Sequence, residues 1–126
     1  MQRRPDRILP LGRQLYEARQ RAQLKAKQLA RMAGVSAAAV YNIERADRGG
    51  RTRTLVELAT ALGLTLRIPD LAALIRDRQM SIAELAEAAG VAFDTVGGLV
   101  AKPLSGNIRS LEAVCAALGC PPKLIV

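Results

Sequence analysis

Apolar residues recur at three- and four-residue intervals along most of the chain, which is the period of amphipathic helices. In the first half this pattern predicts four short helices, at about residues 8–22, 25–32, 37–45 and 54–62. Gly34 suits the left-handed position that ends a helix. Ser36 is placed to cap the third helix, and Thr54 to cap the fourth. The expected fold class is therefore all-α.

The helical period is broken at two corresponding places. Residues Leu64–Ile68 alternate aliphatic side chains with threonine and arginine, which predicts a short strand. Residues 123–126 break the period in the same way at the end of the chain. We therefore expect a short strand after each half, and a strand pair between the two is one arrangement that this allows.

The chain repeats itself at an offset of 56 residues without a gap. This offset aligns Leu29-Ala30 with Leu85-Ala86, Ala33-Gly34-Val35 with Ala89-Gly90-Val91, and Ala61-Leu62-Gly63 with Ala117-Leu118-Gly119. In the second copy, Ser81 and Glu84 have the spacing of a capping box. The sequence therefore predicts two tandem copies of one four-helix unit, with domains at 1–68 and 69–126.

The composition argues against catalysis. The chain has 126 residues, no His and two Cys, so it has no histidine relay and no His-ligated metal site. Cys115 and Cys120 are too few for a thiolate zinc site, and their spacing is not that of a redox motif. We expect neither enzymatic activity nor a cofactor. No apolar run is long enough for a membrane span, and the N-terminus lacks the apolar core of a signal peptide, so we expect a cytoplasmic protein.

Positive charge is concentrated in the first copy. The whole chain carries a formal net charge of +8. Residues 1–68 hold 14 Lys or Arg and 5 Asp or Glu, whereas residues 69–126 hold 5 and 6. A surplus of this kind favours a polyanionic partner, and its position assigns that partner to the first copy.

Residues 28–45 resemble the Xre family, the Cro and lambda-repressor type of bacterial and phage regulators. The resemblance rests on Leu29-Ala30, Gly34-Val35-Ser36 and Ile43-Glu44-Arg45. It implies two tandem lambda-repressor-like helix-turn-helix units and a DNA-binding transcriptional regulator whose partner is a double-stranded DNA operator. It also implies an internal pair between Glu44 and Arg19. The second copy is similar to the family through Glu84-Leu85-Ala86 and Gly90-Val91.

The face of helix 37–45 opposite Val40 and Ile43 is the candidate reading face. An asparagine at position 42 can pair with adenine through two hydrogen bonds, and Arg45 can reach phosphate or guanine. Tyr41 on the same face has an alternative role in packing, and a solvated basic face is the alternative for each surrounding cation. The candidate DNA-binding residues are Lys25, Lys27, Gln28, Ser36, Ala37, Ala38, Tyr41, Asn42, Arg45, Arg48, Arg51 and Arg53.

The second copy has lost these reading residues. Gly97-Gly98 stand where the first copy has Tyr41-Asn42, and Asp94 would repel phosphate. We therefore expect Phe93, Leu99 and Val100 to line a protein-binding surface, the alternative being that they complete a small core.

Two modes of assembly and two functions follow. We favour a homodimer whose first copies read half-sites one helical turn (~34 Å) apart, with a pseudo-two-fold pairing of the two copies as the alternative. The expected function is repression of its own operon. The strand at 64–68 resembles the HipB-type antitoxin branch, in which a short strand helps to pair two subunits. The alternative function is therefore an antitoxin or antiactivator that binds a toxin or a second regulator through the second copy.

Overall fold

The computed structural model describes residues 9–45 and 50–126, and its described part is built from short helices and one small sheet. We call α1 to β1 the N-terminal unit and α5 to β2 the C-terminal unit. The N-terminal unit contains α1 (Leu11–Arg21), α2 (Ala26–Ala33), α3 (Ala37–Arg45), α4 (Thr52–Ala61) and β1 (Thr65–Arg67). The C-terminal unit contains α5 (Leu71–Asp77), α6 (Ile82–Ala89), α7 (Phe93–Ala101), α8 (Ile108–Ala117) and β2 (Lys123–Ile125). The predicted all-α class is confirmed.

Two of the three helix caps that the sequence predicts are present. The backbone N–H of Ala39 donates to Ser36 Oγ at 3.1 Å, which confirms the predicted cap of α3. Glu84 N donates to Ser81 Oγ at 3.0 Å and Ser81 N donates to Glu84 Oε1 at 2.8 Å, so the capping box of α6 is also confirmed. The predicted cap at Thr54 is wrong, because α4 already begins at Thr52.

The two units share unusual backbone positions as well as sequence. Gly34 and Gly90 end α2 and α6 with φ angles of 74° and 69°, in the left-handed region where glycine has no steric penalty. Gln23 and Gln79, which correspond at the 56-residue offset, also have positive φ angles, of 58° and 53°. Since positive φ is uncommon for a residue with a side chain, its recurrence at equivalent positions supports a duplicated unit.

The two units pair within one chain through equivalent residues. Strands β1 and β2 are antiparallel, and Arg67 lies opposite Lys123, its own equivalent at the offset of 56. A second antiparallel bridge joins Arg51 to its equivalent, Asn107. Pairing of equivalents at two separate places is the signature of a two-fold axis, so the chain contains an internal pseudo-two-fold axis.

Reciprocal hydrogen bonds accompany the second bridge. Thr52 N donates to the carbonyl oxygen of Gly106 at 3.1 Å, and Ile108 N donates to that of Gly50 at 3.0 Å. Gly50 corresponds to Gly106 and Thr52 to Ile108, so the two bonds exchange places under the pseudo-two-fold rotation. These bonds fix the backbone that enters α4, and this explains why α4 begins before Thr54.

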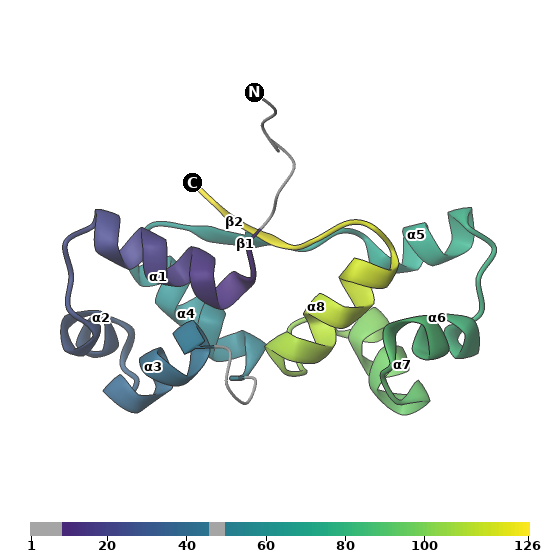
Figure 1. Cartoon of the computed structure of the whole chain (residues 1–126), viewed down its shortest axis with the longest axis horizontal. Helices are drawn as coiled ribbons and strands as arrows, with labels where there is room; N and C mark the ends of the chain where they lie inside the picture. The colour runs from purple at the N-terminus through teal and green to yellow at the C-terminus, as the bar shows by residue number, and fades with distance from the viewer. Residues whose placement is uncertain (1–8, 46–49) are drawn as a thin grey trace, which may run out of the picture.

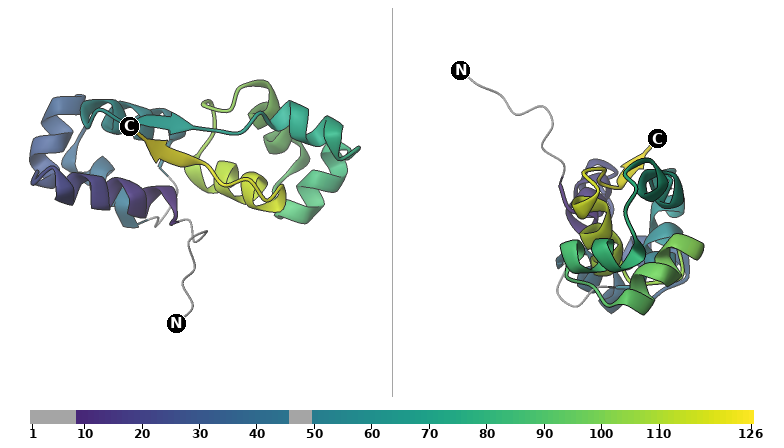
Figure 2. Two further views of the ribbon diagram at one scale, coloured as in Figure 1. Left: turned by 90° about the horizontal axis from the view of Figure 1, so that it is seen from above. Right: turned by 90° about the vertical axis from the view of Figure 1, so that its right-hand side faces the viewer.

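The pseudo-two-fold axis places the units side by side in an elongated molecule (Figure 1). The strands lie along one edge, α4 and α8 lie in the middle, and α3 and α7 lie along the opposite edge, one in each unit (Figure 1). Figure 2 shows the same arrangement from above and from one end. The strand pair that the sequence allowed is present, and it joins the two copies of one chain. This arrangement is the pseudo-two-fold pairing of the two copies that the sequence left as an alternative.

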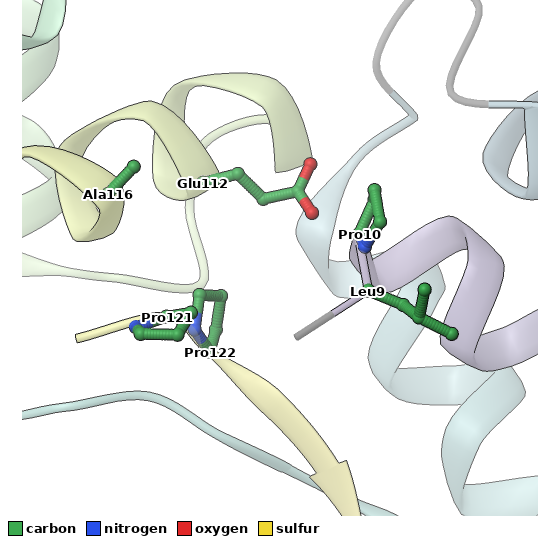
Figure 3. A pocket seen from close by; sticks show the side chains of 6 residues that line it. All are labelled: Leu9, Pro10, Glu112, Ala116, Pro121 and Pro122. Atoms are coloured by element: carbon green, nitrogen blue, oxygen red, sulfur yellow. The ribbon is translucent and has the colours of Figure 1, made fainter. Parts of the chain in front are cut away.

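The C-terminal unit also holds the start of α1. Leu11 N donates to Glu112 Oε2 on α8 at 2.7 Å, so the carboxylate satisfies a free amide at the positive end of the α1 dipole. Gln14 Oε1 accepts from Leu124 N of β2 at 2.8 Å. Figure 3 shows Glu112 reaching toward Pro10 across a small pocket that Pro121 and Pro122 also line. Because its carboxylate already serves as a cap, Glu112 has a structural role there.

The thiols offer no reactive group in the core. Cys115 is fully buried on α8, and burial raises the pKa of its thiol to about 11, with smaller contributions from Cys120 and Glu112. The neutral thiol therefore predominates at physiological pH. Cys120 is half-buried, and both cysteines are free. No helix in the described ranges is long and apolar enough to cross a membrane.

Candidate nucleic-acid interface

A tight turn joins α2 to α3. The turn is closed by a hydrogen bond from Val35 N to the carbonyl oxygen of Ala30, at 2.9 Å. Leu29 of α2 and Val40 and Ile43 of α3 are buried, with at most 2 % of their surface exposed. Since one face of α3 is committed to the core, its opposite face is presented to solvent along the edge of the molecule (Figure 1).

A buried ion pair fixes the end of α3 against α1. Arg19 Nε lies 2.6 Å from Glu44 Oε2, and Arg19 Nη2 lies 2.8 Å from Glu44 Oε1. The third nitrogen, Nη1, donates to the carbonyl oxygen of Leu24 at 2.9 Å. The two side chains are only 8 % and 6 % exposed, and the hydrogen bond to Glu44 raises the pKa of Arg19. The pair that the family resemblance implied is therefore confirmed. Its bidentate geometry sets the orientation of α3.

Four candidate residues form a continuous exposed face on α3. Ala38, Tyr41, Asn42 and Arg45 are all exposed, and 43 % of the Tyr41 surface is accessible. The guanidinium carbon of Arg45 lies 5.7 Å from the centre of the Tyr41 ring, within cation–π range. Ala37 is half-buried against the core. This face combines an amide, an aromatic ring and a cation on one rigid helix.

The remaining candidates surround this face or support it. Lys25 and Lys27 are exposed on the α2 side of the turn, as is Arg31. Gln28 is exposed, and its Oε1 accepts from Lys25 N at 2.7 Å, so this side chain caps α2. Arg51 and Arg53 are exposed at the start of α4, beside the pseudo-two-fold axis. Arg48 lies outside the described residues.

The equivalent face of the C-terminal unit has different chemistry. A methyl group added at Gly97 or Gly98 of α7 would meet no other atom within 4 Å, so this face is bare backbone with open space around it. Residues 25–45 contain four Lys or Arg and one Glu, whereas the equivalent residues 81–101 contain three Asp or Glu and no Lys or Arg. The three acids, Glu84, Glu87 and Asp94, are exposed.

The three candidate partner-binding residues are not all on the surface. Phe93 is 58 % exposed. Leu99 is 1 % exposed and belongs to the core, because it follows Val96 by three residues and shares its buried face. Val100 is half-buried against the same core. The expectation that Leu99 lines a protein-binding surface is therefore wrong. Leu99 instead completes the core, as the alternative had it.

The sequence does not predict the residues that position the two edge helices relative to each other. Glu112 and Gln14 hold α1 to the C-terminal unit, and Gly50 and Gly106 carry the reciprocal bonds at the axis. The 56-residue offset shows that the two glycines correspond. It does not show that they touch, so the sequence carries no signal for these contacts.

Comparison with known families agrees with both halves of this description. A model described as a helix-turn-helix domain matches residues 10–74, which is more than half of the chain. A second model, described as a Cro/C1-type HTH DNA-binding domain, matches residues 70–123. Neither the curated proteins nor the solved structures provide a match.

Proposed function

Because the chain belongs to the helix-turn-helix family of DNA-binding regulators, we propose that it is a sequence-specific repressor that reads its operator with α3. The observation that carries the proposal is the exposed face of Tyr41, Asn42 and Arg45, held in orientation by the buried Arg19–Glu44 pair. We propose that it binds the promoter of its own operon in the cytoplasm. Bound there, it represses the operon by excluding RNA polymerase.

The proposed contacts divide by chemistry. Asn42 pairs with adenine, Arg45 reaches guanine or phosphate, and the Ala38 methyl packs on a thymine methyl. Lys25, Lys27, Gln28, Ser36, Arg48, Arg51 and Arg53 contact the phosphate backbone. Phosphate contacts set the position of α3 in the groove, and the α3 side chains supply the sequence preference. We assign this reading to a domain at 1–68, and a supporting role to a domain at 69–126.

We predict a steep salt dependence of DNA binding. Each cation that neutralises a phosphate releases counterions from the DNA. Five of the proposed backbone contacts are cations, so a plot of the logarithm of affinity against the logarithm of salt concentration should have a slope of about −4 to −5. Affinity should fall by a few hundred-fold between ~50 and ~200 mM salt. The measurement is fluorescence anisotropy with a duplex that contains the promoter of the chain's own gene.

Charge variants provide the control for this measurement. Lys27→Ala and Arg53→Ala should each reduce the slope by about one, whereas Arg76→Ala, an exposed change on α5, should leave it unchanged. Absence of binding, or an affinity that salt does not change, would contradict the proposal. A reporter gene fused to the same promoter tests whether the chain represses or activates transcription. Activation would refute repression but not DNA binding.

A second candidate function is capture of a protein partner, a toxin or another regulator, through the C-terminal unit. Exposure of Phe93 on a unit without cations on α6 and α7 favours it. We expect Phe93→Ser to abolish co-purification with the product of the neighbouring gene while DNA affinity is retained. A point variant is the sharper tool here, since deletion of 69–126 would also remove β2 and the Glu112 cap. Undiminished co-purification by the variant would count against this surface.

A further inference from the structure

The internal pseudo-two-fold axis has consequences for the symmetry of the DNA site. Two-fold related helix-turn-helix units on DNA place their reading helices in successive major grooves, about one helical turn apart. In a homodimer both units read the same bases, so the site is an inverted repeat. Here α3 and α7 lie along one edge, as in such a pair, but they belong to one chain and differ in sequence (Figure 1).

The surfaces on the axis are already occupied. Strand β1 is paired with β2, and the backbone at Gly50 and Thr52 is bonded to its equivalent at Gly106 and Ile108. The second unit therefore fills the position of a second subunit at both places where equivalent residues meet.

The two edge helices cannot read DNA equally. Tyr41, Asn42 and Arg45 of α3 correspond to Gly97, Gly98 and Ala101 of α7, which have no side-chain group that can bond to a base edge. The exposed carboxylates of Glu84, Glu87 and Asp94 repel phosphate, whereas none of their equivalents in the N-terminal unit is acidic.

We propose that one chain, without a second copy, covers the length of a two-half operator and reads bases in one half only. The operator is then a single half-site flanked on one side by DNA of indifferent sequence, and it has no inverted repeat. This proposal rests on the proposed function, because it assumes that α3 reads DNA.

The test is selection of binding sequences from a library of random duplexes, about three helical turns long, with the full-length chain. The expected result is one short motif without an inverted copy, bound by one chain per duplex as measured by native mass spectrometry. An inverted repeat, or two chains per duplex, would overturn the inference and leave DNA reading intact. Enrichment of no sequence at all would instead overturn the proposed function.

A variant with restored reading residues sharpens the test. Gly97→Tyr, Gly98→Asn, Ala101→Arg and Asp94→Ala together copy the α3 face onto α7, and a Cβ atom added at either glycine meets no other atom within 4 Å. This variant should select an inverted repeat and bind it about 10- to 100-fold more tightly than the unchanged chain does. The matched control, Gly97→Ala with Gly98→Ala, strengthens the helix but adds no reading group, so it should still select a single half-site.

One result with the restored variant would contradict the inference. Its fold is checked by circular dichroism and thermal melting. A folded variant that still selects a single half-site would show that α7 does not lie at the second half-site, and the inference would fail. Selection with the unchanged chain decides the question even if the variant does not fold.

Discussion

Asn42→Ala and Arg45→Ala are each expected to weaken operator binding by about 10- to 150-fold, and the double variant should bind only as tightly as it binds unrelated DNA. Each change removes hydrogen bonds to base edges, and such bonds are worth ~1–3 kcal/mol of discrimination. Both side chains are exposed, so the fold should be unaffected. Anisotropy titrations with operator and unrelated duplexes measure the loss.

The control for this experiment is an arginine outside the proposed face. Arg76 is exposed on α5, and Arg76→Ala removes the same charge as Arg45→Ala. It should change affinity by less than about twofold at moderate salt, because distant surface charges are screened. Wild-type affinity in both α3 variants, with unchanged melting temperatures, would refute the assignment of α3 as the reading helix.

Arg19→Ala should destabilise the protein by about 3–5 kcal/mol, since it leaves the buried Glu44 carboxylate without its partner. This is a large share of the ~5–15 kcal/mol that stabilises a typical protein. Urea denaturation followed by circular dichroism gives the free energy of unfolding.

The C-terminal unit provides a matched comparison for that loss. Its residues at the positions of Arg19 and Glu44 are Ile75, which is buried, and Val100. The double variant Arg19→Ile with Glu44→Val copies this apolar pair, and it should lie within about 1 kcal/mol of the wild type or above it. If Arg19→Ala proved as stable as the double variant, the ion pair would have no role in holding α3.

Local features of the fold were predictable where short-range chemistry determines them. The helical period located the four helices of the N-terminal unit within a few residues, and the side chains of Ser36 and Ser81 marked the starts of α3 and α6. The pair between Arg19 and Glu44 followed from the family resemblance. The start of α4 was not predictable, because the backbone there is hydrogen-bonded to Gly106 and Ile108 of the other unit.

Assembly was harder to predict than the units themselves. The hydrogen bonds between β1 and β2 would be the same whether the second strand came from the same chain or from another copy, so the pattern at 64–68 could not distinguish them. The candidate reading residues were found because helical spacing places Tyr41, Asn42 and Arg45 on one face. Helical spacing also puts Leu99 on the buried face of Val96, and the structure agrees.

The intramolecular pairing of β1 with β2 alters how a response would depend on the amount of protein. A homodimeric regulator assembles before it binds, so at low concentration its occupancy of DNA rises with the square of protein concentration. Here the two units are held together at an effective concentration set by the chain, and the paired form is present at any dose. Occupancy by a single chain should therefore rise linearly from the first molecules synthesised, which gives gradual control without a threshold.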